Sequence, residues 1–207
     1  MNTRRLAIAV PAVVLAVLAA LLAQDLRSWR DVFARDDLAF AASPRARPDW
    51  NAVAILPGDP AAALLSVGDD RTLRTGVRLF AASYRTGLGF DSGVSQRRLR
   101  SAAQAVLARA AQDPDPRRAS QAYDLAGILA FGESSSAGGS ASATDRAVTD
   151  LQTAVRLDPA NEDAKANLEL LLRLLVAHGA RPGPAAVSGP RASGRRGAGS
   201  GTPGTGY

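Results

Sequence analysis

The sequence predicts an all-α fold, and three observations support this prediction. Apolar residues recur at intervals of three, four and seven positions in several stretches, which is the period of an amphipathic helix. Asp-Pro steps at Asp113-Pro114, Asp115-Pro116 and Asp158-Pro159 separate these stretches, and proline cannot continue a helix. No stretch combines alternating apolar and polar residues with many β-branched side chains, which would be typical of a strand.

The N-terminal part predicts a membrane anchor. A basic flank at residues 1–5, with Arg4 and Arg5, precedes a run from Leu6 to Ala23 that contains no charged residue. A helix of that length is just long enough to cross about 30 Å of bilayer hydrocarbon. We therefore expect residues 6–23 to form a single transmembrane helix. Pro11 lies inside this run, and transmembrane helices tolerate proline better than soluble ones.

Two questions about this anchor stay open. The basic flank favours a cytoplasmic N-terminus and an extracytoplasmic soluble domain in the cell membrane, but the arginines that follow the run also allow the opposite topology. A basic start and an apolar run are also typical of a cleaved signal peptide. No Ala-x-Ala triplet ends the run, which favours the uncleaved anchor.

Residues 24–68 predict a juxtamembrane helix and a connecting loop. We expect the membrane helix to continue into water and to dock on the soluble domain, because one of its faces stays apolar beyond the span. That face carries Leu22, Leu26, Trp29 and Phe33. Trp29 is interpreted as a marker of the membrane interface, where amphipathic rings concentrate. Trp50 is expected to anchor the loop to the domain.

Residues 69–178 predict a helical domain. Periodic apolar residues indicate a helix from about Asp70, capped by Asp69 or Asp70, and a helix from Leu99 to Ala110. The strongest pattern is Asp145–Leu175, which predicts a helix, a stop at Pro159 and a second helix. Asp115 is expected to cap the helix that follows Pro114, and Asn161 the helix that follows Pro159.

The last of these patterns resembles the tetratricopeptide repeat (TPR). The residues at the offsets of the second helix of that repeat are Ala147, Leu151, Ala154 and Pro159. Ala119–Phe131 is similar to the first helix, and Asn167-Leu168 lies where the next repeat begins. The connection between the two helices is longer than in the family, because a Ser/Gly/Ala-rich stretch extends from Glu133 to Ala143. The resemblance covers about one and a half repeats, and it implies a short, irregular TPR-like surface that binds proteins.

Two residues are candidates for binding a partner. In the TPR family the first helices line a concave groove, and Lys165 and Asn167 match first-helix positions that can face it. The resemblance implies that these side chains hold a peptide backbone or a carboxylate. A solvated helix face is the alternative for Lys165.

The sequence does not predict an enzyme. His178 is the single histidine and there is no cysteine, so a catalytic triad or a metal site would lack ligands. The glycine-rich stretch from Gly87 to Gly93 lacks the spacing of a phosphate-binding loop. We therefore expect no catalytic residue, no metal, no cofactor and no small-molecule substrate.

The C-terminal residues 179–207 predict a disordered tail. They are rich in glycine, proline and arginine and contain no acid. Their four arginines account for most of the formal net charge of +6, so the basic character belongs to the tail and not to a patch on the fold. No specific nucleic-acid partner is expected.

These features predict a membrane-anchored protein-interaction scaffold of a bacterial envelope complex. An anchor followed by a degenerate repeat ending in NLELLLRLL resembles the small repeat proteins associated with MoxR-type ATPases and von Willebrand A-domain membrane proteins. That resemblance implies a von Willebrand A-domain protein or a MoxR-type ATPase system as partner. Three alternatives remain: a secreted binding module after signal cleavage, a structural or regulatory subunit without a peptide groove, and a small membrane-associated enzyme that uses His178.

Overall fold

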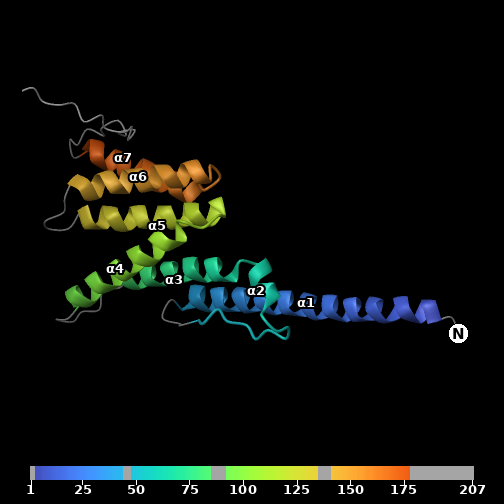
Figure 1. Cartoon of the computed structure of the whole chain (residues 1–207). Coiled ribbons are helices and arrows are strands. Elements are labelled where there is room, and N and C mark those ends of the chain that lie inside the picture. Colours follow the sequence, from blue (N-terminus) through green and yellow to red (C-terminus); the bar gives the residue numbers. More distant parts are fainter. Residues whose placement is uncertain (1–2, 44–47, 85–91, 135–140, 178–207) are drawn as a thin grey trace, which may run out of the picture.

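The computed structural model describes residues 3–43, 48–84, 92–134 and 141–177. Within these ranges every regular element is a helix, so the predicted all-α class is confirmed for this part of the chain. The elements are α1 (Thr3–Ala42), α2 (Pro60–Leu64), α3 (Val67–Ser83), α4 (Ser92–Ala110), α5 (Pro116–Ser134), α6 (Ala141–Leu157) and α7 (Glu162–Ala177). Figure 1 shows α3 to α7 as an array of paired helices, with the N-terminal half of α1 projecting away from it.

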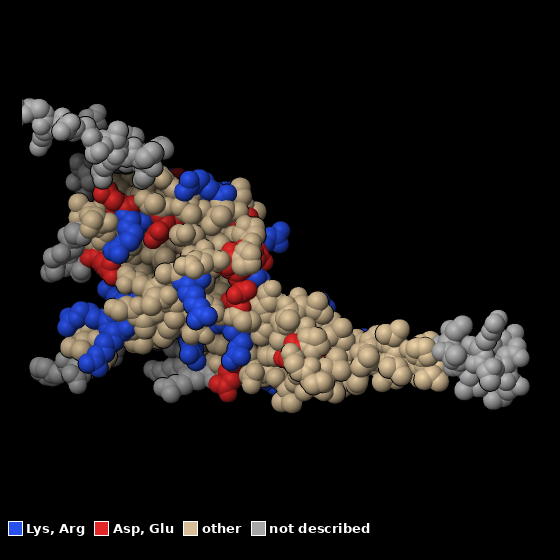
Figure 2. Space-filling model, viewed as in Figure 1, with Lys and Arg blue, Asp and Glu red and all other residues tan. Residues whose placement is uncertain are grey.

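Between Val10 and Leu21 the projecting half of α1 consists of apolar residues alone. Its large side chains stay exposed, among them Val10, Val13, Leu15 and Leu18. Figure 2 shows this projection as almost free of charged side chains up to the undescribed terminus. In the described part of the chain, α1 is the one helix long and apolar enough to cross a membrane.

The second half of α1 packs on the rest of the protein through a cluster that we call the docking cluster. It contains Trp29, Phe33, Trp50, Ala61 and Val67, with Leu22 and Leu26 packed against them. The helix therefore continues beyond the uncharged run, and the predicted apolar face docks it on the rest of the protein. Arg74 of α3 adds a polar link, because its guanidinium donates to Asp37 at 2.9 and 2.8 Å and lies 4.4 Å from the Phe33 ring.

The structure contradicts the predicted location of Trp29 and agrees with that of Trp50. Trp29 does not face a membrane interface: it is 3% exposed, and its indole N–H donates to Asp59 at 3.1 Å. The interface interpretation is wrong because the chain returns after the loop and covers this face of α1. Trp50 anchors the loop as expected, since its indole N–H donates to Asp37 at 2.8 Å and its backbone N–H to Asp36 at 3.1 Å.

The helical array has two further apolar centres. The first lies between α3, α4 and α5 and is built from Leu73, Ala103, Leu107, Ala110, Ala122 and Leu129. The second lies between α5, α6 and α7 and is built from Ala130, Ala147, Leu151 and Leu171. Half of the buried residues in each centre are alanines, which lets the helix axes approach closely.

Most of the predicted helix boundaries are correct. Asp115 accepts the backbone N–H of Arg117 at 2.8 Å, and Asn161 accepts that of Ala164 at 3.0 Å, so both cap as expected. The starts of α3 and α4 are exceptions. α4 begins at Ser92, seven residues before Leu99. α3 begins at Val67, and Asp69 and Asp70 lie in its first turn instead of capping it. The chain leaves α2 directly into α3, and Ser66 turns it with a left-handed backbone at φ 50°.

Candidate functional site: an apolar groove between α6 and α7

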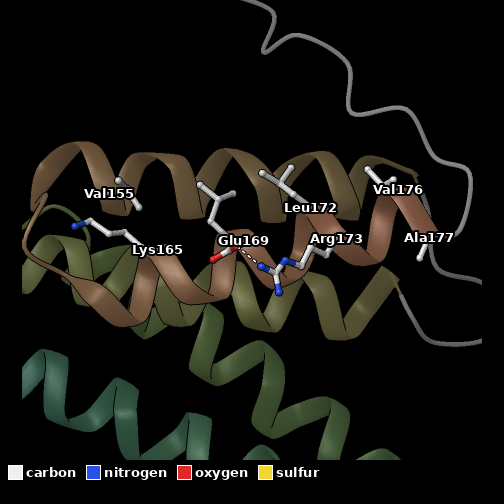
Figure 3. Close-up of a pocket in the computed structure, with 8 residues that line it drawn as sticks. Val155, Lys165, Glu169, Leu172, Arg173, Val176 and Ala177 are labelled. Carbon is white, nitrogen blue, oxygen red and sulfur yellow. Dashed lines mark hydrogen bonds and ion pairs between the residues drawn. The ribbon is translucent and has the colours of Figure 1, made fainter.

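An apolar hollow lies along the outer side of α6 and α7 (Figure 3). Its volume is about 610 Å³, within the range of pockets that hold ligands or side chains of a partner. The lining residues are Val155 from α6 and Lys165, Leu168, Glu169, Leu172, Arg173, Val176 and Ala177 from α7.

The groove forms because the apolar face of α7 is wider than the surface that α5 and α6 cover. Leu171 is buried, and Leu168 and Leu175 pack against the same core. Leu172, which is half-buried, and Val176, which is 67% exposed, lie on the adjacent face. An apolar strip is thus left open on the last described helix of the array.

Charged side chains border this strip in pairs. The Lys165 ammonium lies 2.8 Å from a Glu162 carboxylate oxygen, and the Arg173 guanidinium lies 2.5 Å from Glu169. Both pairs are exposed, so each contributes little to stability and can exchange its partner at small cost. The groove therefore offers an apolar floor with exchangeable charges of both signs at its edge (Figure 3).

The structure separates the two residues that the sequence proposed as partner-binding. Lys165 lines the groove. Asn167 is directed to the other side, where its side-chain N–H donates to Asp124 of α5 at 2.9 Å. Burial raises the pKa of the Asp124 carboxyl, the Asn167 hydrogen bond lowers it, and the charge of Asp163 raises it further. Asn167 thus joins α7 to α5, and the geometry does not bring it to the groove.

The sequence interpretation missed the apolar residues of the site. The sequence does not single out Val155, Leu172 and Val176, which line the groove. One signal was available, because Leu170 and Leu174 widen the apolar face of α7 beyond the stripe that a single neighbouring helix can cover. Leu170 is 57% exposed, and it does not line the groove.

The side chains of the groove are suited to binding rather than to proton transfer. Its titratable groups are Lys165, Glu169 and Arg173, all at the edge and all in ion pairs. Among the described residues no group of three or more acidic or histidine side chains is placed to hold a metal ion. His178, most of the Gly87–Gly93 stretch and the tail 179–207 lie outside the described residues.

Asp150 on α6 gives a pH-dependent prediction for this helix pair. Burial raises the pKa of its carboxyl to about 6, although the charge of Arg146 lowers it. Because this pKa exceeds the unfolded value of about 4, the folded state loses stability as pH rises through 6. Asp150→Asn should therefore raise the free energy of unfolding by about 1 kcal/mol at pH 7.5 and leave it nearly unchanged at pH 4.

Urea unfolding of full-length protein in detergent, followed by circular dichroism at 222 nm at both pH values, measures this difference. Thr149→Asn, at an exposed neighbouring position, is the control. An equal gain from Asp150→Asn at both pH values would show that protonation of Asp150 is not the cause.

Comparisons of this chain with protein-family models, with curated proteins and with solved structures gave no match. The likeness to the tetratricopeptide repeat consequently rests on the residues of the stretch Asp145–Leu175 and its neighbours. The role of the groove rests on its geometry.

Proposed function

We propose that this protein is a membrane-anchored binding scaffold that holds a helical segment of a partner protein in the groove between α6 and α7. The observation that carries the proposal is the open apolar strip on α7, flanked by exchangeable ion pairs. Exposing apolar side chains to water is unfavourable, and an amphipathic helix that packs along the strip would bury them. The strip lies where a further helix of the array would pack.

The chemistry of the groove describes its partner. Leu172 and Val176 are one helical turn apart on α7, so they favour a partner helix with apolar residues at a spacing of three or four. At one end of the groove, Lys165 favours an acidic residue of the partner. Farther along, the Glu169–Arg173 pair can bind a partner side chain of either charge.

The TPR-like character and the cellular setting belong to the same proposal. The spacing of α5, α6 and α7 along the chain supports a short irregular repeat, with α5 and α6 as one pair and α7 as the first helix of the next. From the resemblance of the sequence, the proposed setting is a bacterial envelope complex. A von Willebrand A-domain membrane protein or a MoxR-type ATPase system is the candidate partner there.

The proposed anchor is retained in the mature protein. Leu22 lies within the uncharged run and packs against the docking cluster, so cleavage near Ala23 would remove a side chain from the folded core. Intact-mass analysis of the protein purified from membranes tests this proposal. A mass that lacks the first residues up to about Ala23 would favour the secreted module instead.

The groove is tested by a matched pair of variants on one helix. Val176→Asp places a charge on the floor of the groove, whereas Leu170→Asp places the same charge at an exposed position of α7 that does not line the groove. A photo-crosslinking residue at position 176 or 170 of the full-length protein then identifies the partner peptide in membranes. We expect crosslinks to an amphipathic helix from position 176 and none to that peptide from position 170.

Both variants must first show unchanged circular dichroism. Val176→Asp is expected to weaken capture of the crosslinked partner at least tenfold, and Leu170→Asp to leave it unchanged, since burying an unpaired carboxylate costs more than 1.4 kcal/mol. Lys165→Glu is expected to weaken it less, because Lys165 lies at the edge. Equal capture by all variants would place the binding surface elsewhere and favour a structural subunit without a groove.

A further inference from the structure

The segment Ala52–Leu65 exposes apolar side chains in a second place, far from the groove. Val53 is 87% exposed, Ile55 50% and Leu64 66%. The whole segment contains one charged residue, Asp59, and its carboxylate is occupied by the Trp29 indole and the Ala62 backbone N–H. This patch is therefore apolar without a charged residue free to solvate it.

Hydrogen bonds fix the height of this segment along α1. Asp25, which is fully buried, accepts the backbone N–H of Ile55 at 2.8 Å and that of Leu56 at 3.0 Å. Asp25 lies two residues beyond Ala23, the last residue of the uncharged run, which is about 3 Å along a helix axis. Ile55 is thus held at the level where the membrane-spanning run of α1 ends.

The packing of Leu22 places this segment at the same level along α1, independently of the hydrogen bonds. Leu22, which belongs to the uncharged run, lies against the docking cluster together with Ala62 and Leu65. Figure 1 shows α2 and the preceding loop at the end of the folded part from which bare α1 emerges. The segment Ala52–Leu65 accordingly surrounds the base of the projecting helix.

The backbone of this segment is held in unusual conformations. Left-handed φ values occur within it at Gly58 (78°) and Asp59 (45°), and at the residues that flank it, Trp50 (43°) and Ser66 (50°). At the three residues that are not glycine such conformations cost about 1 kcal/mol or more each, and they persist where the surroundings impose them. The exposed apolar side chains are therefore presented by a constrained segment.

We infer that the segment Ala52–Leu65 is a membrane-contacting collar, in which Val53, Ile55 and Leu64 insert into the headgroup region of the bilayer that α1 crosses. This inference rests on the proposed membrane anchor. The exposed Arg27 and Arg30 follow Ala23 within the next two turns of α1, where they can pair with lipid phosphates. With both α1 and the collar in contact with lipid, the helical array cannot swivel freely about one helix. Its groove lies on the layer of the array farthest from α1 (Figure 1).

The absence of cysteine makes a direct test practical. Single-cysteine variants Val53→Cys, Ile55→Cys and Leu64→Cys of the full-length protein are spin-labelled and reconstituted into vesicles of phosphatidylcholine and phosphatidylglycerol. Accessibility to oxygen, which concentrates in lipid, is compared with accessibility to a water-soluble nickel chelate. Val14→Cys in the span and Ala166→Cys on the exposed surface of α7 are the references.

The collar predicts that labels at 53, 55 and 64 are several-fold more protected from the nickel chelate than the label at 166, and approach the protection at 14. If the three labels match position 166 while position 14 is protected, the collar is wrong and the anchor stands. If position 14 is also open to the chelate, the membrane anchor itself is wrong, and the collar with it. All variants expose their labels on the surface, so circular dichroism should be unchanged.

Discussion

Gly127→Val is expected to lower the free energy of unfolding by about 3 kcal/mol, because α5 and α6 touch at this glycine. A Cβ atom at Gly127 would lie 2.8 Å from Cγ of Leu151 and 3.2 Å from the carbonyl oxygen of Ala147. Leu151 is buried and the oxygen is backbone, so neither can move aside without separating the helices. Urea unfolding of the full-length protein in detergent, followed at 222 nm, measures the loss.

Gly68 provides the matched control. It is also a helical glycine, in α3, but a Cβ there would meet no atom within 4 Å. Gly68→Ala should therefore be neutral or stabilising by up to about 1 kcal/mol, the usual gain from replacing glycine in a helix. Gly127→Ala should still destabilise despite the same gain in propensity. A stable Gly127→Val protein would mean that α5 and α6 do not pack as closely as described.

Asp25→Ala is expected to detach the loop from α1 at a cost of about 3 kcal/mol. The substitution leaves the amides of Ile55 and Leu56 without their acceptor in a partly buried position, where each unpaired amide costs about 1 to 3 kcal/mol. Asp25→Asn keeps one carbonyl oxygen and should lose about half as much. Asp31→Ala, which removes an exposed acid from the same helix, should have little effect.

Tryptophan fluorescence reports this event selectively. The chain has two tryptophans, Trp29 and Trp50, and both lie in the docking cluster. In Asp25→Ala we expect their emission to shift to longer wavelength at a lower denaturant concentration than the loss of helix at 222 nm. Coincident transitions at the wild-type midpoint would show that Asp25 does not hold the loop.

The helices and their ends follow largely from local sequence. Proline and the capping side chains act within one turn, so the stop before Pro159 and the cap at Asn161 were correctly predicted. The docking face of α1 was equally visible, because its apolar side chains recur at the helical period. The start of α3 was missed because Ser66 adopts its left-handed backbone for a chain reversal from α2 that has no local signal.

The site could be predicted only in part. Lys165 lines the groove as a first-helix residue of the repeat would, whereas Asn167 contacts Asp124, 43 residues earlier in the chain. Sequence spacing places Lys165 and Asn167 on one helix but does not predict which face of that helix packs against α5. A wide apolar face predicts that a helix packs against more than one neighbour. It does not predict which of its side chains remain exposed.

The pattern of this chain specifies an apolar membrane-length helix and a series of capped helices, because propensity, proline stops and amphipathic period act between near neighbours. Long-range contacts specify the rest. Asp25 meets Ile55 and Leu56 across 30 and 31 residues, and this pairing sets the height of the collar on α1. The groove opens because α5 and α6 cover one side of α7 and leave Val176 exposed and Leu172 only half-buried, which is a property of helix packing and not of any single segment.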